Sequence, residues 1–162
     1  MTTKSPVSNT VAFLICVAIP LAIGFLGSMF TMESVKTWYI TINKPSFNPP
    51  NWIFAPVWTT LYLLMGIASF RVWRKRKTLE WFHWAVVIYI IQLVFNLMWS
   101  YIFFGLHQIG FALIEIVLLL LLIIINAFIF YRFDKLAGWL FLPYFLWVSF
   151  ATYLTYSIFV LN

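Results

Sequence analysis

Charged residues are scarce in this sequence, because 9% of its 162 residues are Asp, Glu, Lys or Arg and only four are acidic. Soluble globular domains carry about a quarter charged residues, which excludes water as the main solvent of this chain. Cysteine is almost missing as well, since Cys16 is the single one. The chain therefore has neither a disulfide framework of its own nor a cysteine metal cluster.

Side chains with familiar catalytic chemistry are also missing from the long apolar segments. No lysine lies inside these segments, which excludes a retinal Schiff base and lysine-based covalent catalysis in the membrane. His83 and His107 fall at opposite ends of one segment, about 36 Å apart at the rise of an α-helix, so they cannot jointly bind one haem. Asp134, the only aspartate, is expected at the opposite membrane face from His107, which argues against a Ser-His-Asp triad.

Hydrophobic residues, by contrast, make up 64% of the chain and gather in five runs. The runs cover approximately residues 10–30, 53–72, 81–104, 110–131 and 138–160. Each is close to the roughly 20 residues that a membrane-spanning helix needs. The apolar stretch from Ile116 to Ile125 is uninterrupted, whereas a β-barrel strand would alternate polar and apolar positions. The sequence predicts an all-α integral membrane protein, a five-transmembrane-helix bundle that forms a single domain over residues 1–162.

Basic residues concentrate on one side of the predicted membrane. With five spans, the N-terminus and the second and fourth connections share a side, which holds eight of them: Lys4, Arg71, Arg74, Lys75, Arg76, Lys77, Arg132 and Lys135. The other side holds only Lys36 and Lys44. This bias predicts a cytoplasmic N-terminus in a bacterial cytoplasmic membrane, with the mitochondrial outer membrane as the location if the source is eukaryotic. The net charge of +6 is therefore assigned to topology, and no nucleic-acid partner is predicted.

The connection between the first two runs, from about Thr31 to Asn51, is the longest and is rich in rigid residues. It contains Trp38, Tyr39, Pro45, Pro49 and Pro50. Proline restricts the backbone, and Trp and Tyr favour the membrane interface, so this segment is predicted to form a structured lid. An interfacial tether is the alternative interpretation.

Three of the runs carry aromatic and polar residues at helical spacing. These are Ala55, Trp58, Thr59, Tyr62 and Gly66 in the second run, Gln92, Asn96, Trp99, Ser100 and Phe103 in the third, and Tyr144, Trp147, Ala151 and Leu154 in the fifth. A buried amide needs a partner, so Asn96 is expected to face other helices or a ligand. Glu115 lies at a similar depth in the next run and is expected to pair with Asn96 as interhelical glue, with a direct ligand contact as the alternative.

Three ordered blocks of residues allow a comparison with a known family. They are Trp38-Tyr39, Lys44-Pro45, Pro49-Pro50, Pro56-Val57-Trp58 and Tyr62; then Gln92, Asn96, Trp99-Ser100 and Phe103-Phe104; and finally Pro143-Tyr144, Trp147, Phe150-Ala151 and Leu154. With these blocks the chain resembles the TspO/MBR family, the translocator proteins once called peripheral benzodiazepine receptors. The resemblance covers nearly the whole chain.

The resemblance implies a five-helix bundle, commonly a homodimer, with a pocket that opens toward the first loop. Its ligands would be porphyrins such as protoporphyrin IX or other flat hydrophobic molecules, including benzodiazepines and isoquinoline carboxamides, and no cofactor is obligatory. The implied ligand-binding residues are Ala55, Trp58, Tyr62, Asn96, Phe111, Ile114, Trp147, Ala151 and Leu154. Lys36 and Lys44 are candidate partners for the porphyrin propionates. No catalytic residue and no metal site is predicted.

The function that this resemblance implies is tetrapyrrole binding by a membrane sensor, regulator or transporter. Two alternatives stay open, namely light-dependent degradation of porphyrin, and transport of another hydrophobic solute such as a lipid. No Lys or Arg follows Tyr156, so the cholesterol motif of the animal members is incomplete.

Overall fold

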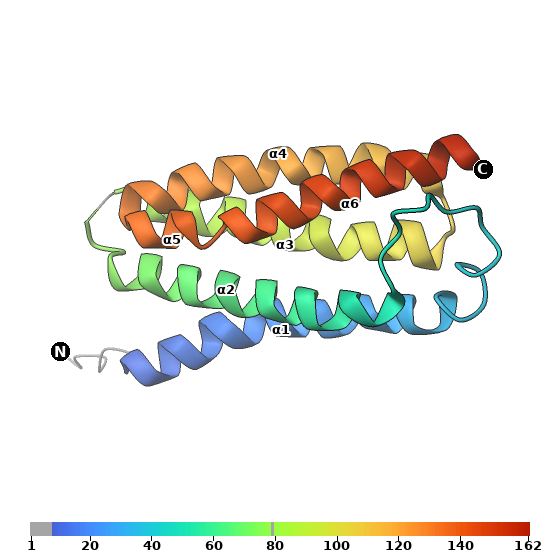
Figure 1. Cartoon of the computed structure of the whole chain (residues 1–162). Coiled ribbons are helices and arrows are strands. Elements are labelled where there is room, and N and C mark those ends of the chain that lie inside the picture. The colour runs from blue at the N-terminus through green and yellow to red at the C-terminus, as the bar shows by residue number, and fades with distance from the viewer. Residues whose placement is uncertain (1–7, 79) are drawn as a thin grey trace.

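The structure, a computed structural model, describes residues 8–78 and 80–162 and is built from helices that run side by side (Figure 1). In chain order these are α1 (Asn9–Ser34), the short 3₁₀ helix η1 (Asn51–Ile53), α2 (Phe54–Arg74), α3 (Phe82–Ser100), the π-helix η2 (Tyr101–Gly105), α4 (Ile109–Phe133), α5 (Lys135–Trp139) and α6 (Leu142–Leu161). Within the described residues, five helical segments are long and apolar enough to cross a membrane. The prediction of an all-α, five-span membrane protein is confirmed.

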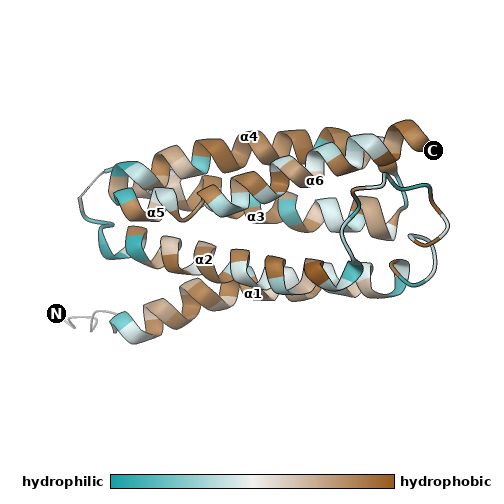
Figure 2. Ribbon diagram, in the orientation of Figure 1, coloured by the Kyte–Doolittle hydropathy of each residue, from teal (hydrophilic) through white to brown (hydrophobic). Residues whose placement is uncertain are grey.

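The helices pack in a defined order: α1 contacts α2 and α3, α3 contacts α4, and α4 contacts α6. The interior is filled by aliphatic side chains such as Met65 and Ile123 together with aromatic ones such as Phe130, Phe141 and Tyr144. Large apolar residues such as Leu14 and Phe128 point outward, with 60% and 70% of their surface exposed. Hydrophobic residues cover the length of the bundle, and hydrophilic ones gather mostly at its ends (Figure 2). This distribution suits a hydrocarbon solvent.

Helices α1 and α2 approach each other closely at Gly66. A Cβ atom at this position would lie 2.7 Å from the Cα atom of Val17 on α1. Any larger side chain would therefore push the two backbones apart. Small residues allow this kind of close contact between helices in a membrane, where van der Waals packing replaces the hydrophobic effect as the main attraction.

The fifth span is a broken helix. The sequence predicts a single run over residues 138–160, whereas the structure has α5 from Lys135 to Trp139 and α6 from Leu142 to Leu161. The carboxylate of Asp134 caps α5 by accepting a hydrogen bond of 3.0 Å from the backbone N–H of Ala137. Pro143 lies in the first turn of α6, where its missing N–H costs nothing, and this explains why the helix restarts there.

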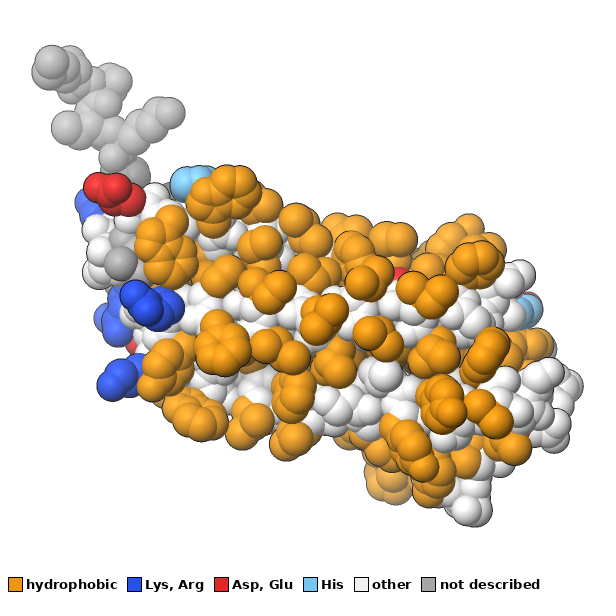
Figure 3. Space-filling view, turned by 90° about the horizontal axis from the view of Figure 1, so that it is seen from above, with side chains coloured by type: hydrophobic (Ala, Val, Ile, Leu, Met, Phe, Trp, Pro, Cys, Tyr) orange, Lys and Arg blue, Asp and Glu red, His pale blue; other side chains and the backbone are white. Residues whose placement is uncertain are grey.

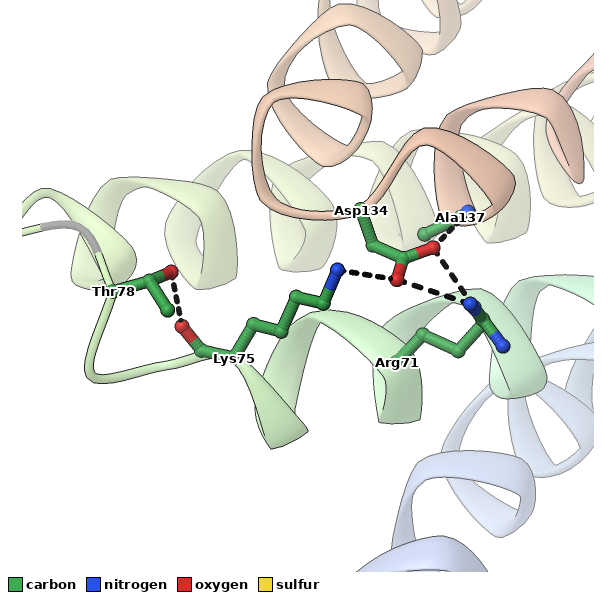
Figure 4. Close-up of polar contacts among 5 residues, drawn as sticks. All are labelled: Arg71, Lys75, Thr78, Asp134 and Ala137. Atoms are coloured by element: carbon green, nitrogen blue, oxygen red, sulfur yellow. Dashed lines mark hydrogen bonds and ion pairs between the residues drawn. The ribbon is translucent and has the colours of Figure 1, made fainter.

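Asp134 also joins α2 to the α4–α5 junction (Figure 4). Its oxygens accept hydrogen bonds from Arg71 Nε at 2.8 Å and Arg71 Nη2 at 3.0 Å, and Lys75 Nζ lies 2.9 Å away. Burial opposes ionisation of the carboxyl, but the hydrogen bonds from Arg71, Lys75 and Ala137 outweigh it and hold the pKa of Asp134 well below its usual value. Lys and Arg side chains gather at one end of the face shown in Figure 3.

The first loop, residues 35–50, is ordered, as the prediction of a structured loop required. Tyr39 is buried and donates a hydrogen bond of 2.7 Å from its hydroxyl to Asn48 Oδ1. Burial raises the pKa of Tyr39 to about 12, although the hydrogen bond to Asn48 opposes the shift. Asn43 and Asn162 exchange hydrogen bonds of 2.9 and 3.0 Å, which tie the loop to the end of α6. The loop and the C-terminal end of α6 lie together at one end of the bundle (Figure 1).

Candidate ligand cavity

A cavity of about 560 Å³ lies among α1, α2, the end of α3 and the second half of α6, next to the first loop. Its walls are mostly apolar and aromatic. The main contributions are Leu21, Gly24, Phe25, Ser28 and Thr31 from α1; Phe54, Ala55, Trp58, Thr59 and Tyr62 from α2; Trp99, Ser100, Phe103 and Phe104 from α3 and η2; and Trp147, Ala151, Leu154, Thr155 and Ile158 from α6.

Packing between aromatic rings fixes the orientation of the walls. The indole of Trp58 stacks on the ring of Tyr62, with centroids 5.6 Å apart, and meets Tyr144 edge to face at 6.2 Å. Trp147 packs edge to face on Phe54, with centroids 5.9 Å apart. These contacts join α2 to α6, and they hold two indole rings at the cavity surface.

Six of the nine residues predicted to bind ligand lie on this wall, namely Ala55, Trp58, Tyr62, Trp147, Ala151 and Leu154. The structure thus brings together side chains from two spans that are far apart in the sequence. Of the residues predicted to form the lid, Tyr39 reaches the cavity. Trp38 packs on Phe103 of η2 instead, with centroids 5.5 Å apart. Pro45, Pro49 and Pro50 belong to the ordered loop and its junction with η1.

Asn96 lies one layer behind the wall. Its Oδ1 accepts a hydrogen bond of 2.5 Å from the hydroxyl of Tyr62, and its Nδ2 donates one of 2.8 Å to the hydroxyl of Tyr144. The same Tyr144 hydroxyl accepts a hydrogen bond of 2.8 Å from Gln92 Nε2. Asn126 Nδ2 in turn lies 3.5 Å from Gln92 Oε1. The prediction that the buried amides need interhelical partners is confirmed. In this arrangement Asn96 positions Tyr62.

The predicted pair of Asn96 and Glu115 is wrong. The Asn96 side chain forms its hydrogen bonds with the tyrosine hydroxyls of α2 and α6 instead of with the Glu115 carboxyl group. Glu115 is 6% exposed, and neither of its side-chain oxygens has a hydrogen-bond partner among residues 8–78 and 80–162.

Phe111 and Ile114 do not lie where the prediction put them. They are 66% and 62% exposed on the outer face of α4, and the described cavity wall contains no residue of this helix. The opposite face of α4, with Ala112, Ile116 and Leu119, packs into the bundle. Because α3 and α6 cover that inner face, α4 is separated from the cavity.

Helix α1 and Trp99 contribute wall residues that were not predicted from the sequence. Gly24, Ser28 and Thr31 recur at helical spacing on α1 and could have indicated a face turned away from lipid. Trp99 stacks on Phe103, with centroids 5.3 Å apart. The indole N–H groups of Trp99 and Trp147 are buried without a hydrogen-bond partner in the described part of the chain.

The two lysines of the first-loop region differ in what they contact. Lys44 Nζ donates hydrogen bonds to the carbonyl oxygens of Tyr39 and Ile42 at 2.6 and 2.9 Å, and lies 4.9 Å from the Tyr39 ring centroid. Its ammonium group therefore stabilises the loop itself. Lys36 lines the cavity and is the better placed of the two to meet an anionic group. Within the described residues, no three His, Cys, Asp or Glu side chains cluster as metal ligands would.

Comparison with known proteins adds independent information. A family model described as the TspO/MBR family matches residues 16–161. The chain is similar to Tryptophan-rich protein TspO of Chlorobaculum tepidum, with 43% identity over 91% of this chain and 94% of the relative. It is similar to the protein of the same name from Archaeoglobus fulgidus, with 42% identity over 88% and 91%. The human Translocator protein is 37% identical over 83% of this chain and 80% of its own length.

Proposed function

The chain belongs to the TspO/MBR family, and from this premise we propose that its cavity binds a tetrapyrrole such as protoporphyrin IX. One observation carries the proposal: Trp58 of α2 and Trp147 of α6 line the same apolar cavity. A porphyrin is a wide, flat π-system, so indole rings can pack against it while the cavity removes its surface from water. Other flat hydrophobic molecules, such as benzodiazepines and isoquinoline carboxamides, would use the same walls.

The polar groups of the cavity support the orientation of such a ligand. Lys36 lies near the first loop and would pair with a propionate. The protein would then act as a membrane sensor, regulator or transporter of the tetrapyrrole.

Fluorescence titration of the purified protein tests this function. Protoporphyrin IX is expected to quench the tryptophan fluorescence saturably. Trp58→Phe and Trp147→Phe are each expected to raise the Kd about tenfold, the equivalent of about 1.4 kcal/mol for one lost aromatic contact. Trp84→Phe is the matched control, because Trp84 is 56% exposed on α3 and lies outside the described cavity wall. Quenching that does not saturate, or equal affinity in all three variants, contradicts the proposal.

We further propose that the N-terminus faces the cytoplasm of a bacterial cell. Basic residues of the described chain support this orientation, because Arg71, Arg74 and Lys75 lie at the end of α2 away from the first loop. Lys4, which the sequence places on the same side, lies outside the described residues. Alkaline phosphatase is expected to be active when fused after Asn162 and inactive when inserted after Lys77. The reverse pattern contradicts this orientation.

A further inference from the structure

A second hollow of about 520 Å³ lies on the outside of the bundle, between α2 and α6. Its walls are Pro56, Val57, Thr60 and Leu61 on α2, and Pro143, Leu146, Trp147 and Phe150 on α6. We name this hollow the α2–α6 groove. Helix α2 packs mainly on α1, and α6 packs mainly on α4, so the two groove walls belong to different helix pairs.

The chemistry of the α2–α6 groove suits a hydrophobic guest. Its one hydroxyl side chain, Thr60, already donates a hydrogen bond of 2.8 Å to the carbonyl oxygen of Pro56 within α2. The remaining lining residues are apolar or aromatic. Both helices are membrane spans, and Leu146 is 58% exposed at the groove edge. The groove therefore faces hydrocarbon, where only a molecule dissolved in the bilayer can occupy it.

Trp147 separates the α2–α6 groove from the ligand cavity, because this side chain lines both. On the facing helix, Val57 lines the groove and its neighbour Trp58 lines the cavity. The Trp147 indole N–H has no hydrogen-bond partner in the described residues, so ring packing such as the contact with Phe54 holds the side chain in place. Trp147 is the one residue that lines both described hollows.

We propose that the α2–α6 groove is the entrance through which a flat hydrophobic ligand passes from the bilayer into the cavity, with Trp147 as the movable side chain between them. This inference rests on the proposed function, since it requires that the cavity holds such a ligand. The route avoids the first loop, which Asn43 ties to the end of α6 and which Lys44 stabilises from within. An entrance of this kind controls how fast the ligand binds and leaves, and it has no effect on the equilibrium affinity.

Two substitutions that fill the groove from opposite walls test the inference, Thr60→Phe on α2 and Leu146→Phe on α6. Leu63→Phe is the matched control, because Leu63 is 39% exposed on α2 and lies outside both described hollows. The protein is reconstituted in lipid nanodiscs, and binding of protoporphyrin IX is followed by stopped-flow porphyrin fluorescence. Association and dissociation rates are expected to fall together by about tenfold in both groove variants, with the Kd and the control unchanged.

Each other outcome overturns a specific claim. Rates that match the control in both groove variants show that the ligand uses another route. A raised Kd with an unchanged association rate shows that the groove is part of the binding site and does not serve as an entrance. Wild-type protein that binds no protoporphyrin IX saturably overturns the proposed function and this inference with it.

Discussion

The imidazole ring of His107 stacks on the indole ring of Trp38, with centroids 4.3 Å apart and planes 18° from parallel. His107 sits in the turn between η2 and α4 with a φ of 57°, and its Nε2 lies 3.2 Å from the hydroxyl of Ser34. This contact fastens the start of the first loop to the turn between η2 and α4.

Removal of the His107 ring is expected to loosen the first loop. His107→Gly keeps a residue that tolerates the positive φ, so the change deletes the stacking contact and the Ser34 hydrogen bond without backbone strain. Amide hydrogen exchange over residues 35–50 should become about fivefold faster, since a lost contact of about 1 kcal/mol corresponds to that factor. Leu106→Ala is the control at the neighbouring, 47% exposed position. An equal effect there would show that the His107 contacts do not hold the first loop.

Acid is expected to weaken the fold through Asp134. The folded protein holds the pKa of this carboxyl below its usual value of about 3.9, so the unfolded chain binds a proton more readily. The stabilisation is therefore complete above about pH 5, one unit above the unfolded pKa, and is lost as the pH falls toward the folded pKa. The unfolding free energy in detergent should drop between about pH 5 and pH 3 in the wild type, and Asp134→Asn should flatten this dependence. An unchanged slope in the variant would show that other groups cause the loss.

Tyr62→Phe is expected to destabilise the bundle by about 1–3 kcal/mol, because it leaves the buried Asn96 Oδ1 without its donor. The measurement is the midpoint of thermal unfolding, read by circular dichroism. Tyr153→Phe is the matched control, since Tyr153 is 59% exposed on α6. Equal midpoints in the two variants would show that the Tyr62 hydrogen bond contributes nothing to stability.

Glu115→Leu is expected to leave stability unchanged or to raise it by about 1 kcal/mol. Both carboxyl oxygens are buried without a partner among the described residues, so an apolar replacement removes a cost of desolvation. Glu115→Gln keeps the polarity and should gain nothing. A clear loss of stability in the leucine variant would mean that the carboxyl finds a partner in the membrane, such as a bound ligand or a second copy of the chain.

The spans could be predicted from the sequence because long apolar runs such as Ile116 to Ile125 have no other stable form in a bilayer. The break between α5 and α6 was not predicted, although Pro143, a residue that favours the first turn of a helix, marks it in the sequence. The pocket residues Trp58 and Trp147 followed from their helical spacing and from the family resemblance, and the structure brings them to one cavity.

The sequence did not predict that Phe111 and Ile114 face outward. Glu115 and Asn126 mark the buried face of α4, but Phe111 lies one turn from Glu115, so the helical periodicity did not show that Phe111 meets lipid. The partner of Asn96 was equally undetermined, because two tyrosines and Glu115 all fall at a suitable depth, and only the packing of α2 and α6 decides among them. The homodimer stays a prediction.

The hydrogen bonds that start at Tyr62 pass through Asn96, Tyr144 and Gln92 to Asn126, so α2, α3, α6 and α4 each contribute to one connected set. Tyr62 is its only member on the cavity wall described above. A guest that competes for that single phenol would loosen cohesion among four helices at once.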